Sequence, residues 1–282
     1  MPPPKRILFI APHADDIEIL CNSTCQAAVK SQYQVHECLA CADEYGTSRV
    51  DFRGRRLARI RKSEMNAVSK LYGTDKKGNA KITLHWMPYI DGFVPFTKES
   101  VSRYRRLILD LNPWLIFGPD PFFTIDSHPD HLNTGRNYYF ALKSIPEHER
   151  PKLMLFFQTY RPDFYLPFGD MDLIYRTRIR HRSQFAPLLM KIFTYLGHFI
   201  KRSASNGGRL VDTFRKVVFE PNAHRLPEDK WLPLLRFRRG MWQYGFNFGQ
   251  SRNDFYNVPG LAPILEDYRK NGWLWPIYGD PI

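Results

Sequence analysis

The chain has 282 residues, of which 43% are hydrophobic, so it can form one large α/β domain or one domain with an extension. Its 41 lysine and arginine residues against 28 aspartate and glutamate residues give a net charge of +13, which favours anionic partners such as nucleic acid, a membrane surface or a phosphorylated substrate. Met1–Arg6 runs directly into an apolar strand and no 18-residue uncharged run is present, so we expect no secretory signal, no transmembrane helix and a cytoplasmic protein, at most peripheral at the membrane.

The first predicted element is a strand over Ile7–Ile10, an apolar run typical of a strand buried on both faces of a parallel sheet. Pro12 ends it, because proline cannot donate to a ladder. His13, Asp15 and Asp16 follow at the carboxyl end, where open α/β sheets place ligand sites. They can bind a divalent metal and leave one carboxylate to take a proton from a metal-bound water. Alternatively, one aspartate simply caps the next helix.

A helix over Cys21–Ser31 and a second strand over Val35–Ala42 come next. The four cysteines of the chain lie on these two elements: Cys21, Cys25, Cys38 and Cys41. Residues three apart on a strand point to opposite faces, so we expect buried free thiols rather than a structural zinc site.

An acidic loop, Asp43–Thr47, follows the second strand and is either the rim of a pocket or a solvated turn. A basic helix over Arg53–Leu71 and a third strand over Ile82–Met87 are predicted after it. Asp91 then precedes a glycine, either at the pocket edge or as an ordinary turn residue.

A helix over Val101–Leu111 and a buried strand over Trp114–Gly118 lead to a second polar cluster. This cluster is His128–His131, with the sequence His-Pro-Asp-His, just before a helical pattern over Leu132–Lys143. Two histidines and an acid in four residues are rarely needed for packing. The alternative is a surface turn in which Asp130 caps the helix.

Further strands are predicted over Leu153–Thr159 and, at an edge, over Leu173–Tyr175. The alternation of strands and helices predicts a Rossmann-like, doubly wound α/β fold with a mainly parallel sheet. We expect it to occupy residues 1–220, with a C-terminal extension over 221–282.

The segment Phe185–Ile200 has a helical pattern that is apolar around most of its circumference, and basic residues flank it within 176–202. It suits the domain core, a homo-oligomer contact or a helix lying on an anionic membrane. The 221–282 extension mixes tryptophans with arginines, which favours packing over the catalytic domain or extending a pocket wall. We do not expect nucleic-acid binding, because no regular nucleic-acid module is present.

Together, the two polar clusters resemble the PIG-L/LmbE-like family of zinc-dependent de-N-acetylases, which pairs a Pro-His-x-Asp-Asp motif with a later His-Pro-Asp-His motif. The resemblance covers about residues 5–220. Its further matches are Glu18, Arg61, Glu64, Gly73, Asp91-Gly92 and His181-x-Ser183-Gln184. The chain departs from the family where Ala14 replaces a proline and where Leu20, Asn22 and Ser23 replace glycines.

The resemblance implies a role for each of eight residues: His13, Asp16 and His131 as Zn²⁺ ligands, Asp15 as general base, His128 as oxyanion stabiliser, Asp130 as the residue that orients His128 and favours its charged form, Arg61 as a residue that reaches toward the substrate, and Asp91 as a ligand for sugar hydroxyls. Three protein ligands leave a position for water, as a catalytic zinc requires.

The implied activity is zinc-dependent removal of an N-acetyl group from an N-acetylglucosamine-type amino sugar or glycoside. The basic surface and the Phe185–Ile200 segment favour an anionic or lipid-linked glycoside. Two alternatives remain: a zinc amidohydrolase with a non-sugar substrate, and a non-catalytic protein that uses the basic surface of the same fold to bind lipid or nucleic acid. The second alternative would tolerate loss of the Asp15 carboxylate.

Overall fold

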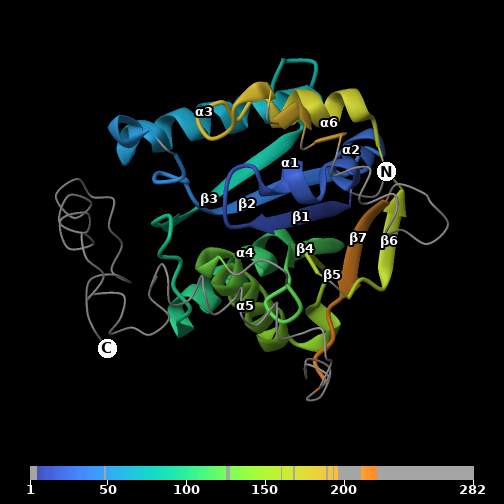
Figure 1. The fold of residues 1–282 in the computed structure, drawn as a ribbon. Coiled ribbons are helices and arrows are strands. Elements are labelled where there is room, and N and C mark those ends of the chain that lie inside the picture. Colours follow the sequence, from blue (N-terminus) through green and yellow to red (C-terminus); the bar gives the residue numbers. More distant parts are fainter. Residues whose placement is uncertain are drawn as a thin grey trace, which may run out of the picture.

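The computed structural model describes residues 5–220, apart from 48, 125–127, 160, 168, 189, 193 and 196–210. These residues form one seven-stranded sheet with helices on both faces (Figure 1). In chain order the elements are β1 (Arg6–Ala11), α1 (Asp16–Leu20), α2 (Asn22–Lys30), β2 (Gln34–Cys41), the 3₁₀ helix η1 (Val50–Phe52), α3 (Arg55–Tyr72), β3 (Ile82–Tyr89), α4 (Lys98–Leu111), β4 (Leu115–Pro119), α5 (Pro129–Ser144), the 3₁₀ helix η2 (Glu147–Glu149), β5 (Leu153–Phe157), β6 (Phe164–Pro167), α6 (Met171–Arg178) and β7 (Val211–Lys216).

The strand order is β3-β2-β1-β4-β5-β7-β6. The first five strands in this order are parallel, and β7 runs antiparallel to both β5 and β6. The predicted doubly wound, mainly parallel sheet is therefore confirmed. The chain reverses its winding direction between β1 and β4, so a crevice opens beyond the carboxyl ends of these two neighbours.

The central strand β1 contributes to a hydrophobic core on each face of the sheet. Leu8 and Ile10 pack in the core that α4 and α5 cover, and Ile7 and Phe9 pack in the opposite core, beneath α1, α2, α3 and α6 (Figure 1). All four side chains are at most 3% exposed, as the unbroken apolar run predicts. Helices thus bury both faces and leave the strand ends for function.

Two glycines allow α5 to lie directly against β4. A Cβ atom on Gly118 would lie 2.4 Å from the ring of Tyr138, and one on Gly135 would lie 2.6 Å from the carbonyl oxygen of Pro119. The Tyr138 hydroxyl also contacts the carbonyl oxygens of Ile116 and Leu155 on the adjacent strands. This close packing fixes the amino terminus of α5, which carries the second motif, beside the crevice.

The structure corrects two predicted elements. The helix predicted over Cys21–Ser31 is α2, and a short helix that was not predicted, α1, precedes it; Cys21, whose φ of −131° and ψ of 15° are not helical, separates the two. Residues 173–175 belong to α6 and not to an edge strand, because the Asp170 side chain caps this helix by accepting from the amides of Asp172 and Leu173. A three-residue apolar run cannot separate helix from strand by its period. The edge strand is β6, which precedes this helix.

In the segment predicted as a long helix, residues 187–188, 190–192 and 194–195 are helical. Its remainder from 196, the loop at 203–208 and the extension over 221–282 lie outside the described residues, so the boundary at 220 stays a prediction. The four cysteines are free and buried, as expected. Among the described residues, every helix is too short or too polar to span a membrane.

Candidate metal centre and active site

The first motif forms the turn between β1 and α1. Asp15 occupies the N-cap position of α1, yet its side chain makes no capping hydrogen bond within the described part of the chain. Asp16 instead accepts from the backbone amide of His13 at 2.9 Å, which holds the turn closed. The capping interpretation therefore does not account for the Asp15 carboxylate.

The two motifs meet at the crevice and bring three potential ligands together: His13, Asp16 and His131, here called the metal cluster. Their ligand atoms all lie within 4.8 Å of one another. Asp16 Oδ2 is 3.5 Å from His13 Nδ1, and Asp16 Oδ1 is 3.4 Å from His131 Nε2. Two imidazoles and a carboxylate at this spacing fit a divalent metal ion.

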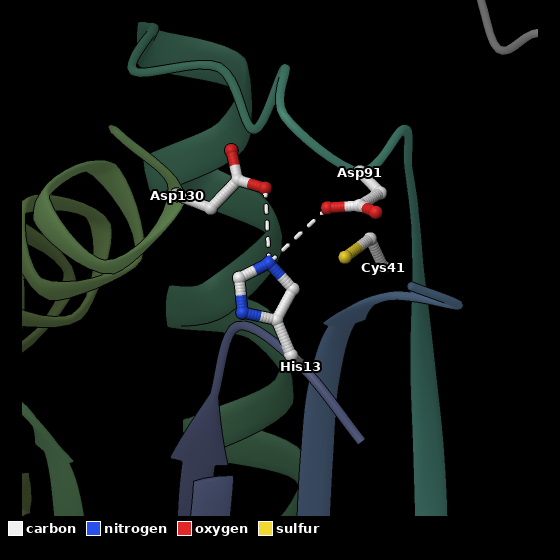
Figure 2. Close-up of side chains that lie close together, drawn as sticks. All are labelled: His13, Cys41, Asp91 and Asp130. Carbon is white, nitrogen blue, oxygen red and sulfur yellow. Dashed lines mark hydrogen bonds and ion pairs between the residues drawn. The ribbon is translucent and has the colours of Figure 1, made fainter. Parts of the chain in front are cut away.

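The second ring nitrogen of His13 contacts two further acids. His13 Nε2 lies 3.2 Å from Asp130 Oδ2 and 3.3 Å from Asp91 Oδ1 (Figure 2). Asp130 also accepts from the backbone amides of Gly92 at 2.6 Å and Val94 at 2.9 Å, so its carboxylate is fixed. This arrangement, in which a carboxylate orients a metal-ligand histidine, fixes the ring and its tautomer. The predicted role of Asp130 in orienting His128 stays a prediction.

His128 lies beside the metal cluster as the N-cap of α5. Its Nδ1 accepts from the backbone amide of Asp130 at 3.2 Å, which leaves the ring hydrogen on Nε2. Its ring centroid is 5.0 Å from that of His13 and 5.7 Å from that of His131. Burial lowers the pKa of His128, although the Asp130 charge opposes this. The Asp130 charge thus acts in the expected direction, toward a charged His128, but burial has the larger effect on the pKa.

The electrostatics of the metal cluster favour a cation. Burial disfavours ionised Asp16, but the imidazoles of His131 and His13 outweigh it and lower the pKa of Asp16 to about 2. Burial also disfavours a charged His13, yet Cys41 and the carboxylates of Asp130, Asp16 and Asp91 together raise its pKa above the usual value. Positive charge is thus stabilised at this position.

Arg61 is fully buried on α3 and is surrounded by acids. Its Nη2 lies 3.4 Å from Asp15 Oδ2, which has no hydrogen bond to any described residue, and it also contacts Asp43 and Gln184. Glu64 lies 3.9 Å from its Nη1. The guanidinium therefore holds Asp15 in place, and the role of Arg61 toward the substrate stays a prediction.

Asp91 connects the acidic loop over Asp43–Thr47 to the metal cluster. Its Oδ2 accepts from the backbone amide of Tyr45 at 2.9 Å, while Oδ1 faces His13. The side chain is 6% exposed. In this arrangement Asp91 braces both the loop and the imidazole, and its role toward sugar hydroxyls stays a prediction.

Sequence reasoning missed two neighbours of the metal cluster. Gln158 follows β5 directly, and its Oε1 lies 2.7 Å from His131 Nδ1. The amide oxygen can accept from that nitrogen and leave His131 Nε2 for a metal. The Cys41 thiol, assigned only to the core, lies next to His13 and Asp91 (Figure 2). Its position at the carboxyl end of a parallel strand, like that of Gln158, was the available signal.

Part of the chain matches a known protein family. Residues 8–142 match the family model of PIG-L, described as GlcNAc-PI de-N-acetylase. This match spans both motifs and ends within α5.

Two curated relatives are deacetylases. Diacetylchitobiose deacetylase of Thermococcus kodakarensis is 25% identical over 229 residues, which cover 73% of this chain and 83% of the relative. The probable N-acetyl-alpha-D-glucosaminyl L-malate deacetylase 2 of Bacillus anthracis is 28% identical over 154 residues, which cover 52% of this chain and 63% of the relative.

A solved structure shares the fold. The N,N'-diacetylchitobiose deacetylase from Pyrococcus horikoshii, complexed with its inhibitor MPG, superposes with a TM-score of 0.67 at 23% identity and covers 80% of this chain and 88% of its own. Residues 8–142 therefore carry a match to the PIG-L family of de-N-acetylases, and the two relatives, at 25% and 28% identity, are named as deacetylases.

Proposed function

We propose that this chain is a zinc-dependent hydrolase that removes the N-acetyl group from a sugar or glycoside of the N-acetylglucosamine type. The observation that carries the proposal is the convergence of His13, Asp16 and His131 at the crevice, with Asp15 held beside them. The relatives named as deacetylases of diacetylchitobiose and of N-acetylglucosaminyl malate support the sugar class.

The donor set suits zinc. His13 would bind through Nδ1, His131 through Nε2 and Asp16 through its carboxylate, because the other ring nitrogens already face Asp130 and Gln158. Three such ligands leave a position for water or substrate. A bound zinc ion would polarise the acetyl carbonyl and lower the pKa of a bound water to about 7.

The remaining chemistry belongs to the protein side chains. Asp15 takes a proton from the attacking water as the water oxygen bonds to the acetyl carbon. The Nε2 hydrogen of His128 donates to the acetyl oxygen as negative charge develops there. The carbon–nitrogen bond then breaks, acetate leaves, and the amine takes the proton that Asp15 collected. Arg61 acts through Asp15 as a positioning residue.

Asp91 is our candidate for binding sugar hydroxyls. It lies at the same crevice as Asp15, and each carboxylate oxygen keeps a lone pair beyond its bonds to Tyr45 and His13. Substitution of Asp91 should therefore raise KM as well as disturb His13.

The function is tested by metal content and product release. The purified protein should hold about one zinc per chain. It should release acetate from at least one of diacetylchitobiose, N-acetylglucosaminyl malate and N-acetylglucosaminyl phosphatidylinositol. Acetate release from non-sugar amides alone would contradict the substrate class, and a zinc-loaded protein that cleaves no amide would favour the non-catalytic alternative.

We further propose that the substrate is presented at an anionic membrane surface. Leu188, Ile192 and Tyr195 are 72%, 53% and 53% exposed, and their spacing of four and three residues aligns them on one face of the helical segment. Four exposed basic residues lie near this apolar stripe along the chain: Arg176, Arg180, Arg182 and Lys191. An apolar face with a basic border suits the interface of an anionic bilayer.

A vesicle flotation assay tests the apolar stripe. The protein should float with vesicles that contain phosphatidylserine and less with phosphatidylcholine vesicles, and the double variant Leu188→Ser, Ile192→Ser should lose this binding. Phe140→Ser is a matched control, because Phe140 is a 40% exposed side chain on α5. Equal flotation of the double variant and the wild type would contradict the membrane contact, as would a concentration-dependent dimer that the double variant abolishes.

A further inference from the structure

A second set of potential ligands lies on the far side of the His13 ring from the metal cluster. It comprises His13, Cys41, Asp91 and Asp130, whose ligand atoms all lie within 4.8 Å of one another. These residues are 8%, 0%, 6% and 0% exposed. Figure 2 shows the sulfur, the imidazole nitrogen and one oxygen of each carboxylate pointing toward a common centre.

The fold aims Cys41 at this centre. Cys41 is the last residue of β2, and the pairing between β2 and β3 is irregular between Leu39 and Cys41. Such irregularities redirect side chains next to functional sites. The thiol donates to the carbonyl oxygen of Pro12 at 3.3 Å, which is a weak hydrogen bond. Cys38, three residues earlier, is instead part of the core beneath α4 and α5.

A thiolate, an imidazole and two carboxylates match the preferences of thiophilic divalent ions, above all Zn²⁺ and Cd²⁺. We propose that His13, Cys41, Asp91 and Asp130 form a second divalent-metal site, and that an ion bound there displaces the ion of the metal cluster. The site therefore makes the protein sensitive to excess zinc or to cadmium.

The shared histidine makes the two sites mutually exclusive. A neutral imidazole has one nitrogen lone pair, so His13 can bind an ion through Nδ1 or through Nε2 but not through both. In the arrangement described, the hydrogen on Nε2 faces Asp130 and Asp91. An ion at the second site takes the place of that hydrogen, which moves to Nδ1 and blocks the metal cluster.

The carboxylates can accept the ion without losing their backbone partners. Asp130 Oδ1 keeps its bond from the Val94 amide, and Oδ2 offers the ion the lone pair that now faces His13. Asp91 Oδ2 likewise keeps the Tyr45 amide while Oδ1 binds. Cys41 binds as thiolate and releases its proton to solvent.

Cadmium titration of the metal-free protein tests this site directly, because a cadmium–thiolate bond gives an ultraviolet charge-transfer band whether or not the protein is an active deacetylase. The wild type should gain this band, and Cys41→Ala should lose it. Cys38→Ala is the matched control, since Cys38 is an equally buried thiol on the same strand, and it should keep the band. Cys41→Ser also lacks the thiolate, but its hydroxyl can still donate to Pro12 and so preserve the local fold. Loss of the band in this variant as well would show that the thiolate is missing and not that the protein has misfolded.

Two further measurements test whether the two sites exclude each other. His131→Ala lacks a ligand of the metal cluster but should keep the cadmium–thiolate band. Adding cadmium to the zinc-loaded wild type should release zinc as the band appears, and release should be weaker in Cys41→Ala. A band that persists in Cys41→Ala, or that forms in the wild type while all zinc stays bound, overturns the proposal.

Discussion

Two buried groups of ionisable side chains lie close to α1, and they differ in how their acids are compensated. The one acid of the metal cluster, Asp16, faces the imidazoles of His13 and His131, and Asp15 beside it faces a guanidinium. The second group, here called the glutamate cluster, lies under α2, α3 and α6 and consists of Glu18, Cys25, Glu37, Tyr72 and His181.

The glutamate cluster is buried, and its Glu37 carboxyl meets a thiol and another acid. Glu37 Oε1 accepts from the Cys25 thiol at 3.6 Å, and its Oε2 has no hydrogen bond within the described part of the chain. Tyr72 donates to Glu18 at 3.2 Å, and His181 Nε2 lies 3.4 Å from the other Glu18 oxygen. Burial, followed by the charge of Glu18, raises the pKa of Glu37 well above its usual value.

The pKa of a buried acid is thus shifted in opposite directions in the two groups. Asp16 ionises at a pKa of about 2 because imidazoles face it, whereas Glu37 keeps its proton because apolar surroundings and another acid face it. Buried acids and histidines therefore do not identify an active site by themselves. The partners that each acid meets do so.

Removing a histidine should have the largest difference in effect between the two clusters, because only the metal cluster is expected to bind zinc. His131→Ala should abolish both zinc binding and acetate release, because two ligands remain. The control His181→Gln changes a histidine of the glutamate cluster and should keep its zinc. Atomic emission measures the zinc content per chain of both variants. Full zinc occupancy in His131→Ala would place the ion elsewhere.

Asp15→Asn should retain zinc and lose turnover by about 10²–10⁴-fold, the usual contribution of a general base. The amide keeps the shape of the side chain but cannot take the proton. Glu37→Gln makes the same chemical change in the glutamate cluster and should keep normal kcat. Normal kcat in Asp15→Asn would remove the base assignment and leave Asp15 a structural role only.

Gln158→Ala should weaken zinc binding by about 10–100-fold, as expected when a partner that orients a metal-ligand histidine is lost. Gln158→Glu should restore affinity, because a carboxylate can accept from the same His131 nitrogen. Competition with a chelator measures the affinity. Tyr72→Phe is the control, since it removes a hydrogen bond only from the glutamate cluster. Unchanged affinity in Gln158→Ala would show that His131 is oriented without this amide.

Glu37→Gln should change the pH dependence of stability. The folded carboxyl keeps its proton above the usual pKa of 4.5, so above that pH the folded state binds more protons than the unfolded state. The free energy of unfolding of the wild type therefore falls as pH rises from 4.5, and the glutamine variant lacks this loss.

Urea unfolding of both proteins between pH 4.5 and 8 measures the difference, which should grow with pH in favour of Glu37→Gln. Glu147→Gln, a change at an exposed glutamate, should follow the wild type throughout. A difference that stays constant with pH would mean that Glu37 is ionised in the folded protein.

The sequence by itself determined the five parallel strands, the two motifs and their place at the same edge of the sheet. The unbroken apolar run Ile7–Ile10 could only be a strand covered on both faces, and the polar residues after it could only lie at its carboxyl end. The same reasoning applied to Trp114–Gly118 and the following motif. The local sequence is sufficient here, because the hydrophobic pattern of a strand and the end at which the next residues lie can both be read from a few consecutive residues.

Only the tertiary structure decided which side chains meet. Asp130 is one residue from the histidine it precedes and two from His128, yet its carboxylate contacts His13, which is 117 positions away along the chain. Arg61 bears the same charge as the solvated arginines of its helix but is completely buried by acids from other segments. Hydrogen-bond partners depend on how whole helices and strands pack together, and the spacing of residues within one segment carries no information about that packing.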